Sequence, residues 1–92
     1  MAWADAVWID VRTAVEHAVD NIDGDDRITH DEIVEGVSER YPDKATEIHL
    51  YCRSGALSRY AEKVLKAMGY TKAVNKGSLK AVRKEQAAKK KP

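Results

Sequence analysis

The residue of this chain best suited to covalent chemistry is its single cysteine, Cys52. It opens the segment Cys-Arg-Ser-Gly-Ala-Leu-Ser at residues 52–58, between an apolar run and a stretch with helical spacing. In a strand-to-helix loop of this kind, successive backbone N–H groups curl around an anion, and the helix dipole adds positive potential. With the guanidinium groups of Arg53 and Arg59, these groups favour the thiolate, which is the nucleophilic form of cysteine. The competing interpretation, a cysteine packed as a small apolar residue in the core, is disfavoured by this glycine-bearing loop.

A second constellation, at residues 21–32, has the ligand spacing of an EF-hand calcium loop. The predicted ligands are the side chains of Asn21, Asp23, Asp25, Thr29 and Glu32 and the backbone carbonyl of Arg27. Against calcium, Asp26 replaces the glycine that gives such loops their sharp turn, and a single hand lacks its usual partner. The alternative is a polar surface loop whose aspartates are solvated or cap the next helix. Both interpretations stay open.

The elements that must position these residues alternate between strand and helix. Strands are predicted at residues 7–11, 28–29, 47–51 and 72–74, helices at residues 13–19, 31–40, 57–68 and from 79, and a turn at residues 76–78. The alternation predicts an α/β fold, a small, mainly parallel sheet flanked by helices. Ligands of such sheets bind at the carboxyl ends of the strands, which is where Cys52 falls.

Length and composition narrow the class of protein. The 92 residues have room for one domain, and the net charge of +1 predicts no general attraction to nucleic acid or to a membrane. We expect a monomer, because no exposed apolar stripe demands a partner. No apolar run approaches the roughly 20 residues of a membrane span, and the N-terminus lacks the order of a signal peptide. The chain as written is expected in the cytoplasm, or in the periplasm if a signal peptide was removed from its parent.

Three ordered motifs resemble the single-domain rhodaneses, and most closely their small phage-shock type. They are Trp-Ile-Asp-Val-Arg at residues 8–12, Leu-Tyr-Cys-Arg-Ser-Gly at residues 50–55, and Met-Gly-Tyr at residues 68–70 with Asn-Lys-Gly-Ser-Leu at residues 75–79. The resemblance implies a rhodanese-like domain over residues 1–79, followed by a basic helix or frayed tail over residues 80–92. It also implies a thiosulfate sulfurtransferase in which Cys52 attacks a thiosulfate-type donor, releases sulfite and passes sulfur from a persulfide to a thiol or cyanide, with no cofactor.

The resemblance assigns roles to individual residues. The catalytic residue would be Cys52, and the substrate-binding residues would be Arg53, Ser54, Gly55, Ala56, Leu57 and Ser58. Asp10, Arg12 and Arg59 would support them, the first two through charge-assisted hydrogen bonds beneath the loop, unless they are a solvated pair at a strand end. Related loops often carry an arginine at the position of Ala56 or Leu57, and its absence here predicts weakened thiosulfate binding.

Two other functions are compatible with parts of the sequence. Phosphatases of this fold use a loop of the form C-x5-R, but Ser58 stands at the arginine position and Arg59 follows one residue late. The stronger alternative is a catalytically weak or silent rhodanese-fold binding module, calcium-responsive or engineered. The state of Cys52 after exposure to thiosulfate distinguishes that module from an enzyme.

Overall fold

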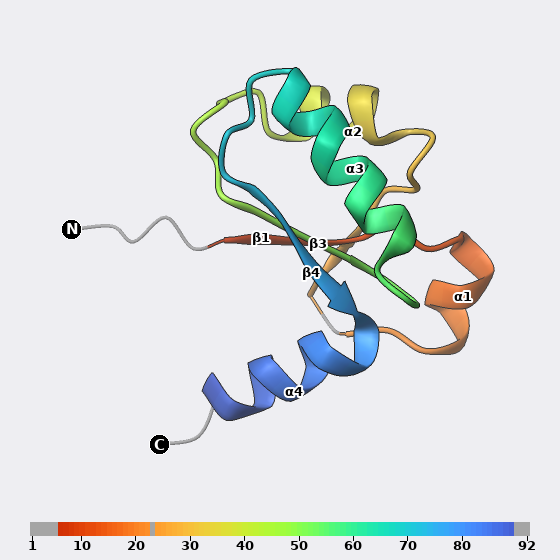
Figure 1. The fold of residues 1–92 in the computed structure, drawn as a ribbon. Coiled ribbons are helices and arrows are strands. Elements are labelled where there is room, and N and C mark those ends of the chain that lie inside the picture. Colours follow the sequence, from red (N-terminus) through yellow and green to blue (C-terminus); the bar gives the residue numbers. More distant parts are fainter. Residues whose placement is uncertain (1–5, 23, 90–92) are drawn as a thin grey trace.

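Four parallel strands form the centre of the structure (Figure 1). The computed structural model describes residues 6–22 and 24–89. Within them the strands are β1 (Val7–Asp10), β2 (Asp26–Arg27), β3 (Ile48–Cys52) and β4 (Ala73–Ser78). Their order across the sheet is β2-β1-β3-β4, and every neighbouring pair is parallel. The predicted α/β class with a small parallel sheet is confirmed.

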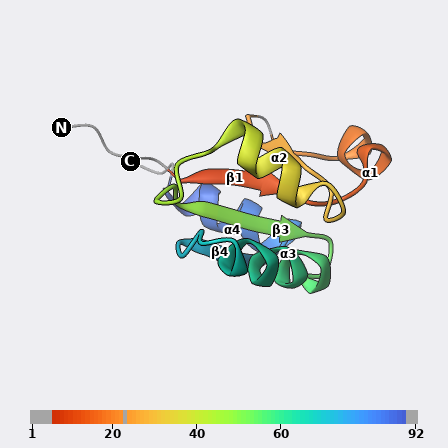
Figure 2. The ribbon, with the colours of Figure 1, turned by 90° about the horizontal axis from the view of Figure 1, so that it is seen from above.

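Helices cover both faces of this sheet. They are α1 (Ala14–Val19), α2 (Ile33–Arg40), α3 (Ala56–Ala67) and α4 (Leu79–Lys89). Figures 1 and 2 show α2 and α3 on one face, α4 on the opposite face, and α1 beyond the carboxyl end of β1. Among the described residues, no helix is long and apolar enough to cross a membrane.

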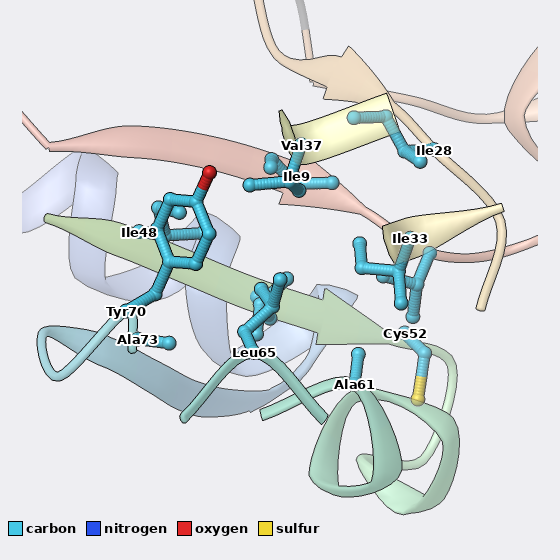
Figure 3. Packing of buried hydrophobic residues seen from close by; sticks show 12 residues of the cluster. Ile9, Ile28, Ile33, Val37, Ile48, Cys52, Ala61, Leu65, Tyr70 and Ala73 are labelled. Atoms are coloured by element: carbon cyan, nitrogen blue, oxygen red, sulfur yellow. The ribbon is translucent and has the colours of Figure 1, made fainter. Parts of the chain in front are cut away.

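The central strand β3 is buried along its whole length because both of its faces are covered. Side chains alternate between the faces of a strand. Ile48, Leu50 and Cys52 therefore point into the larger core, which lies under α2 and α3 (Figure 3). Tyr51 points to the other face and packs with Leu79 and Val82 of α4. The cysteine is thus directed toward α3 by its register in the strand.

Local sequence signals set the ends of two helices. Thr13 caps α1: the Thr13 hydroxyl accepts from the Glu16 amide at 3.2 Å, and the Glu16 carboxylate accepts from the Thr13 amide at 3.3 Å. Gly55 precedes α3 in a left-handed conformation with φ of +93°. A Cβ there would also lie 3.3 Å from Gly77 Cα, so glycine meets both a backbone and a packing requirement.

Three sequence predictions were wrong in detail. The short strand expected at residues 28–29 is β2, two residues earlier, and Cys52 is the last residue of β3 rather than the first of a loop. The turn expected at residues 76–78 continues β4, because Leu50 pairs with Asn75 whereas Tyr51 pairs with Gly77. Lys76 is the extra residue of this bulge, which extends the pairing as far as Cys52 and Ser78.

The C-terminal segment packs on the sheet. Its helix α4 runs to Lys89, and the side chain of Val82 is fully buried against Tyr51. Loop residues also meet this face, since the Tyr51 hydroxyl donates to Asp25 Oδ2 at 2.7 Å. Burial raises the pKa of Asp25 above its ordinary 3.8, although hydrogen bonds from Tyr51 and Gln86 oppose that rise.

We predict that Asp25→Asn stabilises the protein at neutral pH. A carboxyl whose folded-state pKa is raised holds its proton more tightly in the folded state, so stability falls as pH rises above the unfolded value. The amide oxygen of asparagine still accepts from Tyr51 and carries no charge. Thermal unfolding should give the variant a higher Tm near pH 7 and no such advantage near pH 3, below the ordinary aspartate pKa. An equal loss of Tm at both pH values would contradict this account.

Candidate active site

The sulfur of Cys52 lies at the base of a small cavity at the carboxyl end of the sheet. The residue is 2% exposed, and Figure 3 shows its sulfur directed toward α3. The cavity has a volume of about 240 Å³ and is lined by Arg12, Glu16, Cys52, Arg53, Ser54 and Leu57. A small anion in this cavity lies beside Cys52, with two arginines and the acidic Glu16 among the other lining residues.

Two groups from the turn into α3 donate to this sulfur. The Gly55 amide is 2.9 Å from Cys52 Sγ, and the Ser58 hydroxyl is 3.5 Å from it. The Ser58 oxygen also lies 2.7 Å from Asn75 Oδ1 and 3.1 Å from the Gly55 carbonyl oxygen. A hydroxyl has one proton, so its bond to sulfur alternates with these two. The sulfur therefore has one fixed donor and one that rotates.

These donors decide the protonation of the thiol. Burial by itself raises the pKa of Cys52, but hydrogen bonds from the Ser58 hydroxyl and from the amides of Ser58, Ser54 and Gly55 outweigh it. The pKa of Cys52 is therefore lower than its ordinary value of 9.0. A larger thiolate fraction at neutral pH follows, and the thiolate is the form that attacks sulfur.

Asn75 holds the loop around the sulfur from the neighbouring strand. Its Nδ2 donates to the Gly55 carbonyl at 3.3 Å, and its Oδ1 accepts from the Gly77 amide at 2.9 Å. Sequence reasoning placed Asn75 in a motif but gave it no role. The signal that could have singled out Asn75 is its residue type, because asparagine is uncommon in strands and here stands two residues before Gly77.

Beneath the loop lies a buried ion pair. Asp10 is fully buried, and the Arg12 guanidinium donates to its two oxygens at 2.8 to 3.0 Å. The Arg12 side chain also donates to the Asp20 carbonyl, and His17 Nδ1 lies 3.0 Å from Asp10 Oδ2. Burial by itself raises the pKa of Asp10. The hydrogen bonds from Arg12 and His17 together outweigh burial, so the pKa of Asp10 is below its ordinary value. The pair is buried rather than solvated, and it fixes Arg12 in the cavity wall.

The remaining predicted site residues divide into two groups. Arg53, Ser54 and Leu57 line the cavity, although the Arg53 side chain is 85% exposed and lies 3.9 Å from Glu16. Ala56 and Arg59 are not among the lining residues, and both are exposed on α3. The cavity thus contains apolar Leu57, not arginine, at one of the two positions where related loops carry that charge.

Several predicted calcium ligands already make hydrogen bonds or strand contacts within the fold. Asn21 donates to the His17 carbonyl at 2.8 Å, Asp25 accepts from Tyr51, and Arg27 is a strand residue. Thr29 donates to Glu32 at 2.9 Å, and Asp23 lies outside the described residues. In the part of the chain that the structure describes, no three His, Cys, Asp or Glu side chains are grouped to hold a metal.

We predict that Ser58→Ala raises the pKa of Cys52, because it removes a hydrogen bond that stabilises the thiolate. Alkylation of Cys52 by iodoacetamide, followed across pH, should shift its midpoint upward and proceed roughly two- to tenfold more slowly at neutral pH, the effect of one hydrogen bond. Ser54→Ala is the matched control, since Ser54 acts on the sulfur through its backbone amide. Equal profiles for the two variants would show that the Ser58 hydroxyl does not reach the sulfur.

Comparison with known proteins agrees with this geometry. The family model for the rhodanese-like domain matches residues 1–85. The thiosulfate sulfurtransferase PspE of Escherichia coli K12 is 36% identical over 73 residues, which are 79% of this chain and 70% of that protein. A structure of a rhodanese with anions from E. coli has a TM-score of 0.79 at 34% identity, covering 84% of this chain and 91% of its own. The human single-domain sulfurtransferase TSTD1 shares the fold, with a TM-score of 0.71 at 23% identity over 95% of this chain and 84% of its own. The chain belongs to the family of rhodanese-like domains.

Proposed function

We propose that this protein is a sulfurtransferase that moves sulfane sulfur from a thiosulfate-type donor to a thiol or cyanide through a persulfide on Cys52. The observation that carries the proposal is the sulfur of Cys52 at the base of an open cavity, with the Gly55 amide and the Ser58 hydroxyl donating to it. The identity to PspE, a thiosulfate sulfurtransferase, supports the same chemistry.

The first step is attack by the Cys52 thiolate on the outer sulfur of thiosulfate. The new bond joins Cys52 Sγ to that sulfur, the sulfur–sulfur bond of the donor breaks, and its electron pair leaves with sulfite. The amides that bind the thiolate remain in place for the charge on the persulfide, so they do not reorganise during the reaction. The exposed Arg53 in the cavity wall adds positive charge that attracts the dianionic donor, whereas Asp10 neutralises Arg12.

The second step returns the enzyme to its starting state. Cyanide or an acceptor thiolate attacks the outer sulfur, the persulfide bond breaks, and the electron pair of that bond returns to Cys52 as a thiolate. Sulfur transfer needs no cofactor, because both steps exchange one sulfur–sulfur bond for another bond to sulfur. Both substrates are small molecules, and we propose that the protein acts on them as a monomer, independently of nucleic acid and membranes.

A silent binding module of the same fold is the competing candidate. Its sulfur would need no access and no lowered pKa, yet Cys52 has both an open cavity and donors that favour the thiolate. Leu57, at a position where related loops often carry arginine, supplies no charge to the cavity. We therefore propose a working sulfurtransferase with modest affinity for thiosulfate.

We predict that Cys52→Ser abolishes thiocyanate formation from thiosulfate and cyanide, because a hydroxyl in the same place cannot form a persulfide. Intact mass spectrometry should show the wild-type protein gaining one sulfur atom after exposure to thiosulfate, and the variant gaining none. Circular dichroism should show an unchanged fold, since serine is nearly the size of cysteine. Wild-type turnover by the folded variant would end the sulfurtransferase proposal.

Calcium binding at residues 21–32 stays a prediction of the sequence. Asp25 already accepts from the Tyr51 hydroxyl, so a calcium ion would share this carboxylate with a hydrogen bond of the fold. We therefore expect a Kd no tighter than about 10⁻⁴ to 10⁻³ M, the range of the weakest natural modules. Backbone amide NMR during a calcium titration provides the test, with Glu32→Gln as the variant that lacks the bidentate ligand. If the resonances of these residues stay fixed to about 10 mM calcium, well above that range, the segment is an acidic surface loop.

A further inference from the structure

A second, larger cavity lies between α4 and the Cys52 loop. Its volume is about 520 Å³, within the roughly 300–1,000 Å³ of small-molecule sites. It is lined by Arg12, Asp20, Arg53, Leu79, Lys80, Arg83, Lys84 and Ala87, and we call it the α4 groove. Figure 1 shows α4 starting directly at the carboxyl end of β4, so the helix begins at the edge of the sheet where Cys52 lies.

The α4 groove concentrates positive charge on a chain whose net charge is only +1. Five of its eight lining residues are cationic, and Asp20 is the one acidic residue among them. Asp20 neutralises Arg83 through contacts of 2.7 and 3.2 Å, and Asp10 neutralises Arg12. Lys80 and Lys84 are exposed, lie one helical turn apart, and form no ion pair with a described residue. Lys80 and Lys84 are thus the two groove cations without a close acidic partner among the described residues, while the exposed Arg53 lies 3.9 Å from Glu16.

The α4 groove adjoins the cavity that contains the sulfur. Arg12 and Arg53 line both, so they form the wall that the two cavities share. The smaller cavity is large enough for a compact dianion such as thiosulfate. Cyanide is too small to fill the α4 groove. A ligand that fills the α4 groove and still reaches Cys52 must be longer, negatively charged and reactive at one end.

We propose that the α4 groove binds the sulfur acceptor, and that this acceptor is a low-molecular-weight thiol bearing carboxylate groups. This inference rests on the proposed function. The carboxylates lie against Lys80, Lys84 and Arg53, the stem contacts Leu79 and Ala87, and the thiol passes the shared wall to Cys52. Thiols built from amino acids or short peptides have this combination of size and charge.

The same cations assist the transfer. The positive potential of Lys80, Lys84 and the exposed Arg53 lowers the pKa of the incoming thiol and increases its thiolate fraction. The thiolate attacks the outer sulfur of the protonated Cys52 persulfide, the persulfide bond breaks, and its electron pair stays on Cys52 as a thiolate. The outer sulfur leaves with its proton as the hydropersulfide of the acceptor, so atoms and charge balance without an oxidant or reductant.

The test compares two acceptors on protein first loaded with sulfur from thiosulfate. Glutathione carries two carboxylates, and 2-mercaptoethanol carries none. The measured quantity is the ratio of their kcat/KM values. Lys80→Gln combined with Lys84→Gln should lower this ratio roughly five- to tenfold, chiefly through KM for glutathione, as removal of two partly exposed ion pairs predicts. The wild-type ratio should also fall with added salt, because salt screens exposed charges.

Lys63→Gln combined with Lys72→Gln is the matched control, because it removes two exposed lysines that do not line the groove. This control should keep the wild-type ratio. An unchanged ratio in the Lys80 and Lys84 variant overturns the proposal, whether the groove then takes an acidic protein segment or a second copy of the chain. Mass spectrometry of the loading step separates this failure from that of the sulfurtransferase itself, since a protein that gains no sulfur fails before any acceptor is added.

Discussion

The hydrogen bond from the Gly55 amide to the Cys52 sulfur depends on a backbone that turns sharply between β3 and α3. That turn needs the left-handed conformation of Gly55, and the approach of Gly77 leaves little room for a side chain there. Asn75 joins the two segments by bonding to the Gly55 carbonyl and the Gly77 amide. The surroundings of the sulfur are therefore fixed by backbone geometry, which makes them available before any substrate arrives.

The sheet places this turn at the carboxyl ends of its parallel strands, where ligands of such sheets bind. The register of β3 directs Cys52 toward α3, while Tyr51, one residue earlier, faces α4. A slip of one residue would exchange these side chains and bury the thiol under the wrong helix. The bulge at Lys76 extends β4 to Ser78, so the last residue of β3 is paired on one side and the sulfur has a rigid support.

Charged side chains are paired beneath the site, whereas two at its entrance are unpaired among the described residues. The Asp10 and Arg12 pair is buried, and a buried pair costs desolvation that its hydrogen bonds must offset. It orders the cavity wall and contributes little net charge. Lys80 and Lys84 are exposed and lack ion-pair partners among the described residues, so they give the α4 groove its positive potential. The site thus joins a neutralised, rigid interior to a cationic entrance.

The sequence by itself determined the α/β class and the cysteine loop, because each depends on residues close together in the chain. The sequence did not predict the ends of β2 or the bulge in β4, because pairing with neighbouring strands decides where short strands begin and end. Only the tertiary structure decided that Ser58 and Asn75 share one hydrogen-bond network with the sulfur. It also decided that Asp25 accepts from Tyr51 of β3 and that α4 forms a groove beside Cys52, because these contacts join segments far apart in sequence.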